Sequence, residues 1–196
     1  MKRVFVAAFF LMTLAALGQA PSQDTPQFTK DNRLVPPANY REWVFLSSGV
    51  GMTYSRPIAP GSDPAFDNVF VEPSAYRKFL ETGAWPDKTI FVLENRKSMN
   101  SGCLNNDGCR YQGDISGMAA EVKDTARFKG GWGFFGFGPN VSSAKLLGPT
   151  ANCYTCHPQN GAVDNTFVQF YPTLLPIARA KGTLKASYLQ QPAAAH

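Results

Sequence analysis

Two cysteines and a histidine near the C-terminus have a spacing that is closely tied to one chemistry. The stretch reads Cys153-Tyr154-Thr155-Cys156-His157, which is the C-x-x-C-H pattern of c-type haem attachment. Two thiols at this spacing can add to the two vinyl groups of one porphyrin, and the histidine that follows is then held under the iron as its proximal ligand. The sequence therefore predicts one haem c, bonded through Cys153 and Cys156, with His157 as the metal ligand.

Two other chemistries also use closely spaced cysteines. A structural zinc site needs four ligands, and the further candidates in this chain are Cys103, Cys109 and the terminal His196. A thioredoxin-like dithiol is expected beside a β-α-β pattern, and no such pattern precedes Cys153. Both alternatives stay open, but the pattern favours haem attachment.

The first twenty residues are typical of a secretory signal peptide. A basic start at Met1-Lys2-Arg3 is followed by an apolar run from Val4 to Leu17 and then by small residues up to Ala20. The alternative is an uncleaved anchor, although the run is shorter than the roughly 20 residues of a spanning helix. Export to the periplasm or secretion is consistent with haem attachment, which takes place outside the cytoplasm.

The remaining 176 residues are enough for one domain with its own core. The formal charge falls from +5 to +3 when Lys2 and Arg3 are removed, and Lys and Arg form no stripe of the kind that binds nucleic acid. We predict a signal peptide at residues 1–20, a flexible leader at 21–33, a haem c domain at 34–182 and a disordered tail at 183–196.

The pattern of the domain favours an α+β fold, in which a mainly antiparallel sheet carries short flanking helices. A helix is expected from Ser74 to Glu81, after Pro73 and before Gly83. A short helical turn is expected at 36–42, a polar loop at 95–109, and helical segments broken by Pro172 and Pro176 at 161–182. Strands are expected at 43–46 and 49–54 around a glycine bulge, and at 68–72, 89–94, 111–123 and 132–137. The haem would be bound near the C-terminus.

Cys103 and Cys109 lie outside the haem motif, and an oxidising compartment favours a disulfide between them. A cross-link that closes so short a loop stabilises a protein by about 2 kcal/mol. The alternative is a pair of free thiols.

The ligand on the other side of the iron is constrained by composition. The chain has only two histidines, and His196 is its last residue, so a second histidine ligand is not expected. A methionine ligand would come from Met52, Met99 or Met118, although each also suits ordinary packing. The remaining possibility is an open iron, which suits small-ligand chemistry better than electron transfer alone.

Several stretches, taken in order, resemble the cytochrome P-460 family. They are Trp43–Tyr54, Val69–Tyr76, Gly83–Glu94 and Cys153–Tyr171. The resemblance runs from about Leu34 to Tyr171. It implies a mainly antiparallel β fold, usually a homodimer, with one c-type haem whose five-coordinate iron is held by a histidine.

The resemblance also implies one of two activities. P-460 cytochromes proper oxidise hydroxylamine and carry a lysine bonded to the porphyrin edge, whereas the cytochrome c′-β branch lacks that bond and binds nitric oxide or carbon monoxide. The lysine precedes a V-x-V-x-P strand, and this chain has Asp67 or its neighbour Phe66 there. No lysine occurs between Lys30 and Lys78, which weighs against hydroxylamine oxidation.

Three further sets of side chains have a possible role. Glu94 matches the acidic strand end that reaches the distal pocket in the family, so it is a candidate catalytic proton relay; the alternative is a solvated strand end. Phe66 is a candidate cap over the iron, or ordinary core. Arg41 and Arg96 suit haem propionates, or are simply surface charges.

Three functions follow from these observations. The first is a haem oxidoreductase that acts on hydroxylamine or a related small nitrogen compound and passes electrons to another cytochrome. The second is a gas-binding protein without turnover. The third is a simple electron-transfer cytochrome c, which would need a methionine ligand.

Overall fold

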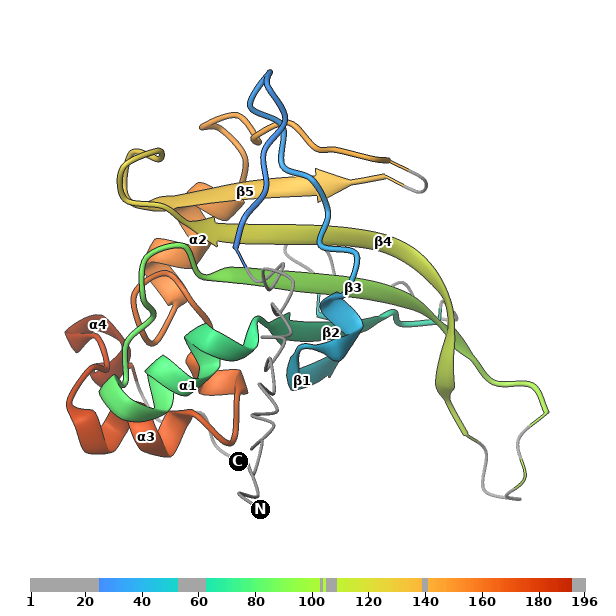
Figure 1. Cartoon of the computed structure of the whole chain (residues 1–196). Helices are drawn as coiled ribbons and strands as arrows, with labels where there is room; N and C mark the ends of the chain where they lie inside the picture. Colours follow the sequence, from blue (N-terminus) through green and yellow to red (C-terminus); the bar gives the residue numbers. More distant parts are fainter. Residues whose placement is uncertain (1–24, 53–62, 103, 105–108, 139–140, 192–196) are drawn as a thin grey trace, which may run out of the picture.

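The computed structural model describes residues 25–52, 63–102, 104, 109–138 and 141–191. Five antiparallel strands form one sheet in chain order, so each strand pairs with its neighbour in the sequence (Figure 1). The strands are β1 (Val44–Val50), β2 (Phe66–Val71), β3 (Ile90–Met99), β4 (Tyr111–Lys123) and β5 (Trp132–Phe137). The predicted α+β fold with a mainly antiparallel sheet is confirmed.

Short helices flank the sheet. They are α1 (Pro73–Thr82), α2 (Cys153–Asn160), α3 (Leu175–Lys181) and α4 (Ala186–Leu189), with 3-10 turns η1 (Tyr40–Glu42) and η2 (Val168–Phe170). The start of α1 is fixed by Pro73 and by the Glu72 side chain, which accepts hydrogen bonds from the backbone N–H groups of Ser74 and Ala75. It ends at Gly83, whose φ of 72° is left-handed. The predicted limits of this helix are therefore confirmed.

The structure differs from the predicted elements in several places. The strand expected at 49–54 ends at Val50, and the irregular pairing of β1 lies between Phe45 and Ser47 rather than at a glycine. A polar loop was expected from residue 95, but β3 continues to Met99 because its backbone pairs with β4 as far as Met99 and Tyr111. Polar side chains do not end a strand whose partner strand continues beside it. Part of the segment expected as a disordered tail forms α4, and Pro176 lies in the first turn of α3 rather than breaking a helix.

The sheet is covered on both faces. One face, called here the helix face, packs Phe91, Trp132 and Phe134 against α1, α3 and the segment after α2. On the other, called the N-terminal face, Val92, Val122 and Phe135 pack against Leu34, Tyr40 and Trp43. In Figure 1 the N-terminal segment, in blue, crosses this face. The apolar strand cores are thus buried on both sides.

Two expectations lie outside the described residues. The predicted signal peptide falls within residues 1–24, and Cys103 is also undescribed. Export and the Cys103–Cys109 disulfide therefore stay predictions. Within the described part of the chain, no helix is long and apolar enough to cross a bilayer.

Candidate functional site

A cavity of about 810 Å³ lies between the helix face of the sheet and α2. Its walls are mainly apolar, and its volume is within the range of pockets that hold cofactors. Beyond the sheet, the wall includes Cys153, Cys156 and His157 from α2 and the aromatic rings of Phe167 and Phe170. The cavity therefore brings the C-x-x-C-H motif against the middle of the sheet.

The register of the strands arranges the sheet side of the cavity into three rows. Successive rows are two residues apart along each strand, which is roughly 7 Å. The lining residues are Phe91, Glu121 and Phe134 in the first row, Ser47, Val69, Leu93, Ala119 and Gly136 in the second, and Gly49, Asp67 and Asn95 in the third. The first row lies beside His157, so the third row is the far end of the cavity.

The three side chains of the C-x-x-C-H motif share one face of α2, because positions i, i+3 and i+4 of a helix lie together. Both thiols are free and half-buried, and burial raises the pKa of Cys153. His157 is buried between the rings of Phe134 and Phe167, each 4.6 Å away between ring centroids. The structure thus brings together the three residues that the sequence predicted as a unit.

His157 is oriented through its Nδ1 atom. The carbonyl oxygen of Asn165 and Oε2 of Glu121 each lie 2.9 Å from Nδ1. One Nδ1 hydrogen cannot be aligned with both, and Oε2 of Glu121 has no aligned donor. Burial on its own lowers the pKa of His157, but the Glu121 charge and the acceptors at Nδ1 outweigh it and raise that pKa. Because Nδ1 faces these acceptors, Nε2 is the ring nitrogen that would bind a metal.

The loop after α2 holds Asn165 in place. A Cβ at Gly161 would lie 2.8 Å from the backbone nitrogen of Thr166, so this tight return of the chain needs glycine. Trp85 Nε1 donates to Thr166 Oγ1 at 2.8 Å, and Lys123 Nζ binds Asp164 at 2.7 Å. The carbonyl that orients His157 is therefore anchored to the sheet and to the segment before β3.

The cavity wall fits a flat, largely apolar group. The second row consists of small and aliphatic residues, and a Cβ added to Gly136 would meet no heavy atom within 4 Å. This glycine therefore leaves open space in the second row, at edge strand β5, as expected where a flat group approaches a strand closely. Within the described part of the chain, two buried carboxylate oxygens lack a hydrogen bond of good geometry. They are Oδ2 of Asp67 and Oε2 of Glu121, and both residues line the cavity.

Filling this open space should keep haem out. We expect Gly136→Leu to lose most of its haem content, because the leucine side chain would occupy the volume beside α2. The ratio of haem to protein, measured from absorbance and total protein, checks this. Gly148→Leu is a matched control, since a Cβ there also meets nothing within 4 Å but Gly148 does not line the cavity. Equal haem contents in the two variants would show that the cavity is not the haem site.

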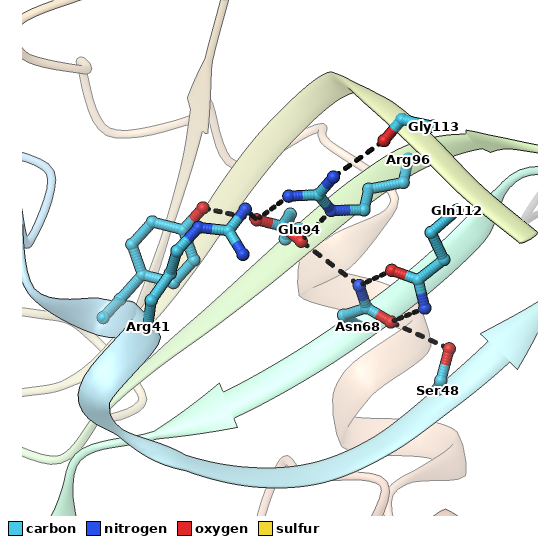
Figure 2. Close-up of polar contacts among 8 residues, drawn as sticks. Arg41, Ser48, Asn68, Glu94, Arg96, Gln112 and Gly113 are labelled. Carbon is cyan, nitrogen blue, oxygen red and sulfur yellow. Dashed lines mark hydrogen bonds and ion pairs between the residues drawn. The ribbon is translucent and has the colours of Figure 1, made fainter.

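Glu94, the predicted proton relay, does not line this cavity. It lies on the N-terminal face and is fully buried, where Arg96 Nε donates to it at 2.5 Å and Asn68 Nδ2 at 3.2 Å. Tyr40 donates at 2.5 Å, and Arg41 also binds the carboxylate. Figure 2 shows Glu94 between Arg41 and Arg96, with Asn68 bridging to Gln112 and Ser48. We call Tyr40, Arg41, Asn68, Glu94, Arg96 and Gln112 the Glu94 network.

The other residues predicted at the haem site lie in several different parts of the structure. Arg41 and Arg96, suggested as partners of haem propionates, bind Glu94 instead. Phe66, the suggested cap, is not among the cavity-lining residues, whereas its neighbour Asp67 is. Among the methionines proposed as ligands, Met52 lines the cavity, Met118 packs on the N-terminal face, and Met99 is partly exposed.

The position of Glu94 predicts an effect on stability. We expect Glu94→Gln to lower the free energy of unfolding by about 3 kcal/mol at neutral pH, because it removes the buried charge that pairs with the partly buried Arg96. Urea unfolding measures this. Glu81→Gln, on the exposed surface of α1, should cost less than about 1 kcal/mol. Equal midpoints for the two variants would contradict a structural role for Glu94.

The pKa of Glu94 predicts that the free energy of unfolding depends on pH. Burial on its own raises the pKa of Glu94, but hydrogen bonds from Arg96, Tyr40 and Asn68 outweigh it and hold that pKa below its usual value. Its contribution is therefore present above the pKa of the unfolded chain and is lost as pH falls through the pKa of the folded state. The stability difference between wild type and Glu94→Gln should accordingly shrink in acid.

A histidine and two thiols on one face of a short helix, against a mainly apolar cavity, are the arrangement typical of haem c proteins. The family model described as Cytochrome P460 matches residues 37–168 of this chain. The chain belongs to the cytochrome P460 family, and this membership implies that it is a haem c cytochrome. No curated protein matches the chain significantly.

The sequence did not predict Glu121, Asn165 or Phe167 as site residues. Glu121 contacts His157, and a signal for it was present, because Ala120 and Val122 on either side of it are buried on the N-terminal face. Alternation along β4 then places Glu121 on the helix face. A carboxylate on a covered face of a strand is unusual and points to a partner there.

Proposed function

We propose that the protein is an exported, mono-haem c-type cytochrome whose iron binds or oxidises small nitrogen species such as hydroxylamine and nitric oxide. The haem would be held covalently by Cys153 and Cys156, and its iron by His157. The observation that carries this proposal is the cavity itself, which extends past the second row to a polar third row at the end away from His157. Such an arrangement leaves space for a small ligand opposite the histidine.

When bound, haem c supplies an iron centre that can take up a small ligand and exchange electrons. The residues of this chain hold it and shape its surroundings. Cys153 and Cys156 fix its position, and Asn165 and Glu121 fix the ring orientation of His157. Phe134 and Phe167 pack on both sides of the imidazole and exclude water from it.

Two alternatives are each favoured by one observation. Asp67 stands where the family resemblance places the cross-linking lysine, and a carboxylate cannot make that bond, so a gas-binding protein without turnover is the second candidate. Met52 lines the cavity, so a methionine-ligated electron carrier is the third. For an oxidation, we propose a second cytochrome as electron acceptor, and the homodimer expected from the family stays part of the proposal.

Anaerobic mixing of the purified holoprotein with nitric oxide and, separately, with hydroxylamine tests the proposal. We expect the optical spectrum to change with both ligands. Reduction of an added cytochrome c in the presence of hydroxylamine would identify the enzyme, and binding without reduction would identify the gas-binding alternative. A spectrum that responds to neither ligand would overturn the proposed function.

A further inference from the structure

We propose that Asp67 determines which ligand this site prefers, because its carboxylate selects small molecules that donate hydrogen bonds, such as hydroxylamine, over diatomic gases such as nitric oxide. The inference rests on the proposed function and deepens it. Three observations support it. Asp67 lines the cavity, its Oδ1 accepts a hydrogen bond from Asn95, and its Oδ2 has no partner among the described residues.

Asp67 lies at the end of the cavity opposite His157. It belongs to the third row of the wall, where Gly49 and Asn95 are its direct neighbours on the adjoining strands. The Glu121 row, which contacts His157, is four residues away along the strands, or roughly 13 Å. A small ligand bound on the side of the cavity away from His157 would therefore lie near Asp67, Asn95 and Met52.

The carboxylate of Asp67 is held through one of its two oxygens. Asn95 Nδ2 donates to Oδ1. The Asn95 amide has room because residue 117, opposite it on β4, is glycine; a Cβ there would lie 3.3 Å from Asn95 Oδ1. Oδ2 of Asp67 is buried and has no hydrogen-bond partner among the residues that the structure describes. The side chain thus has a fixed oxygen and an oxygen left for a ligand.

The Glu94 network holds this arrangement from the other face of the sheet. Asn68, next to Asp67, binds Glu94 and Gln112, and Glu94 and Arg96 flank Asn95 on β3 (Figure 2). These contacts join β2, β3 and β4 directly behind the third row. Because neighbouring residues in a strand point to opposite faces, the network fixes the backbone of Asp67 and Asn95 without entering the cavity.

The chemistry of the unpartnered oxygen favours one class of ligand. A buried acceptor with no donor costs free energy, and a ligand that supplies a donor removes that cost. Hydroxylamine carries O–H and N–H donors, whereas nitric oxide carries none. Burial raises the pKa of Asp67 despite the hydrogen bond from Asn95, so this carboxylate also accepts a proton more readily than an ordinary one.

Asp67→Asn tests the inference with little change in shape. The amide keeps an oxygen that can accept from Asn95, but it replaces the unpartnered acceptor with a donor. Dissociation constants for hydroxylamine and for nitric oxide are measured by anaerobic optical titration of the holoprotein, without an electron acceptor. We expect hydroxylamine to bind about tenfold or more weakly in the variant, since hydrogen bonds to charged groups have effects of this size. The affinity for nitric oxide should stay the same or rise.

Asp114→Asn is the matched control, because Asp114 is exposed on β4 and does not line the cavity. It should leave both dissociation constants unchanged. If Asp67→Asn retains no haem, Asp67→Ser is titrated in its place, with the same expected direction. Unchanged hydroxylamine binding, or equal losses for both ligands, would overturn the role of Asp67.

Different results would refute the proposed function and the role of Asp67. If wild-type protein responds to neither ligand, the proposed function fails and the role of Asp67 fails with it. If wild-type protein binds both ligands and the ratio of their dissociation constants is the same in Asp67→Asn, only the role of Asp67 fails.

Discussion

His157→Gly should abolish the bond between histidine and iron while the haem stays attached to the chain. Glycine removes the imidazole that lies between Phe134 and Phe167, and it leaves both cysteines of α2 in place. Resonance Raman spectra of the ferrous protein should lose the histidine–iron stretching band completely. Added imidazole should restore a band, because the variant leaves a space of matching shape between the two rings.

The rescue by imidazole separates lost ligation from lost folding. Glu121→Gln serves as the control, because it keeps His157 and removes only the charge 2.9 Å from Nδ1. That variant should keep the histidine–iron band and shift it to lower frequency, since a carboxylate near Nδ1 increases the electron density on the imidazole. A band that persists in His157→Gly would mean that another residue binds the iron.

Replacing both Cys153 and Cys156 with serine should abolish covalent retention of haem. The two thiols occupy the first turns of α2 and line the cavity, so they are the groups that would form thioether bonds. Intact-mass spectrometry of denatured protein should show the mass of one haem on wild type and none on the double variant. Each single variant should keep one bond and release haem more readily.

Cys109→Ser is the control for this experiment. Cys109 lies beyond the end of β3, outside α2 and outside the cavity wall. Its replacement should leave the haem mass in place even if the predicted disulfide is lost. Haem that stays covalently bound in the double serine variant would contradict the attachment that the C-x-x-C-H pattern predicts.

Short sequence patterns predicted the elements whose limits are set by neighbouring residues in the chain. The limits of α1 were predicted from Pro73 and Gly83, and β4 was predicted from weak alternation through small residues. The C-x-x-C-H motif needs one helical turn to gather its side chains, so spacing alone predicted that they lie together.

The orientation of β3 could not be predicted in the same way. Residues Ile90 to Leu93 are all apolar and both faces of the sheet are covered, so the run gives no sign of which residues point to which face. A shift of one residue exchanges the two faces. Glu94 was assigned to the pocket from the family resemblance, and the apolar run gave no sign that its neighbour Asn95 lines the cavity instead.

We propose that this chain holds one haem c through α2, with His157 on one side of the iron and an open position on the other. The coordination state of the iron in the purified, ligand-free ferrous protein tests it most directly, by optical and resonance Raman spectroscopy. We predict a high-spin, five-coordinate iron with a histidine band and an ordinary c-type spectrum that changes with nitric oxide. A low-spin, six-coordinate iron that becomes five-coordinate in Met52→Ala would contradict it and identify an electron carrier.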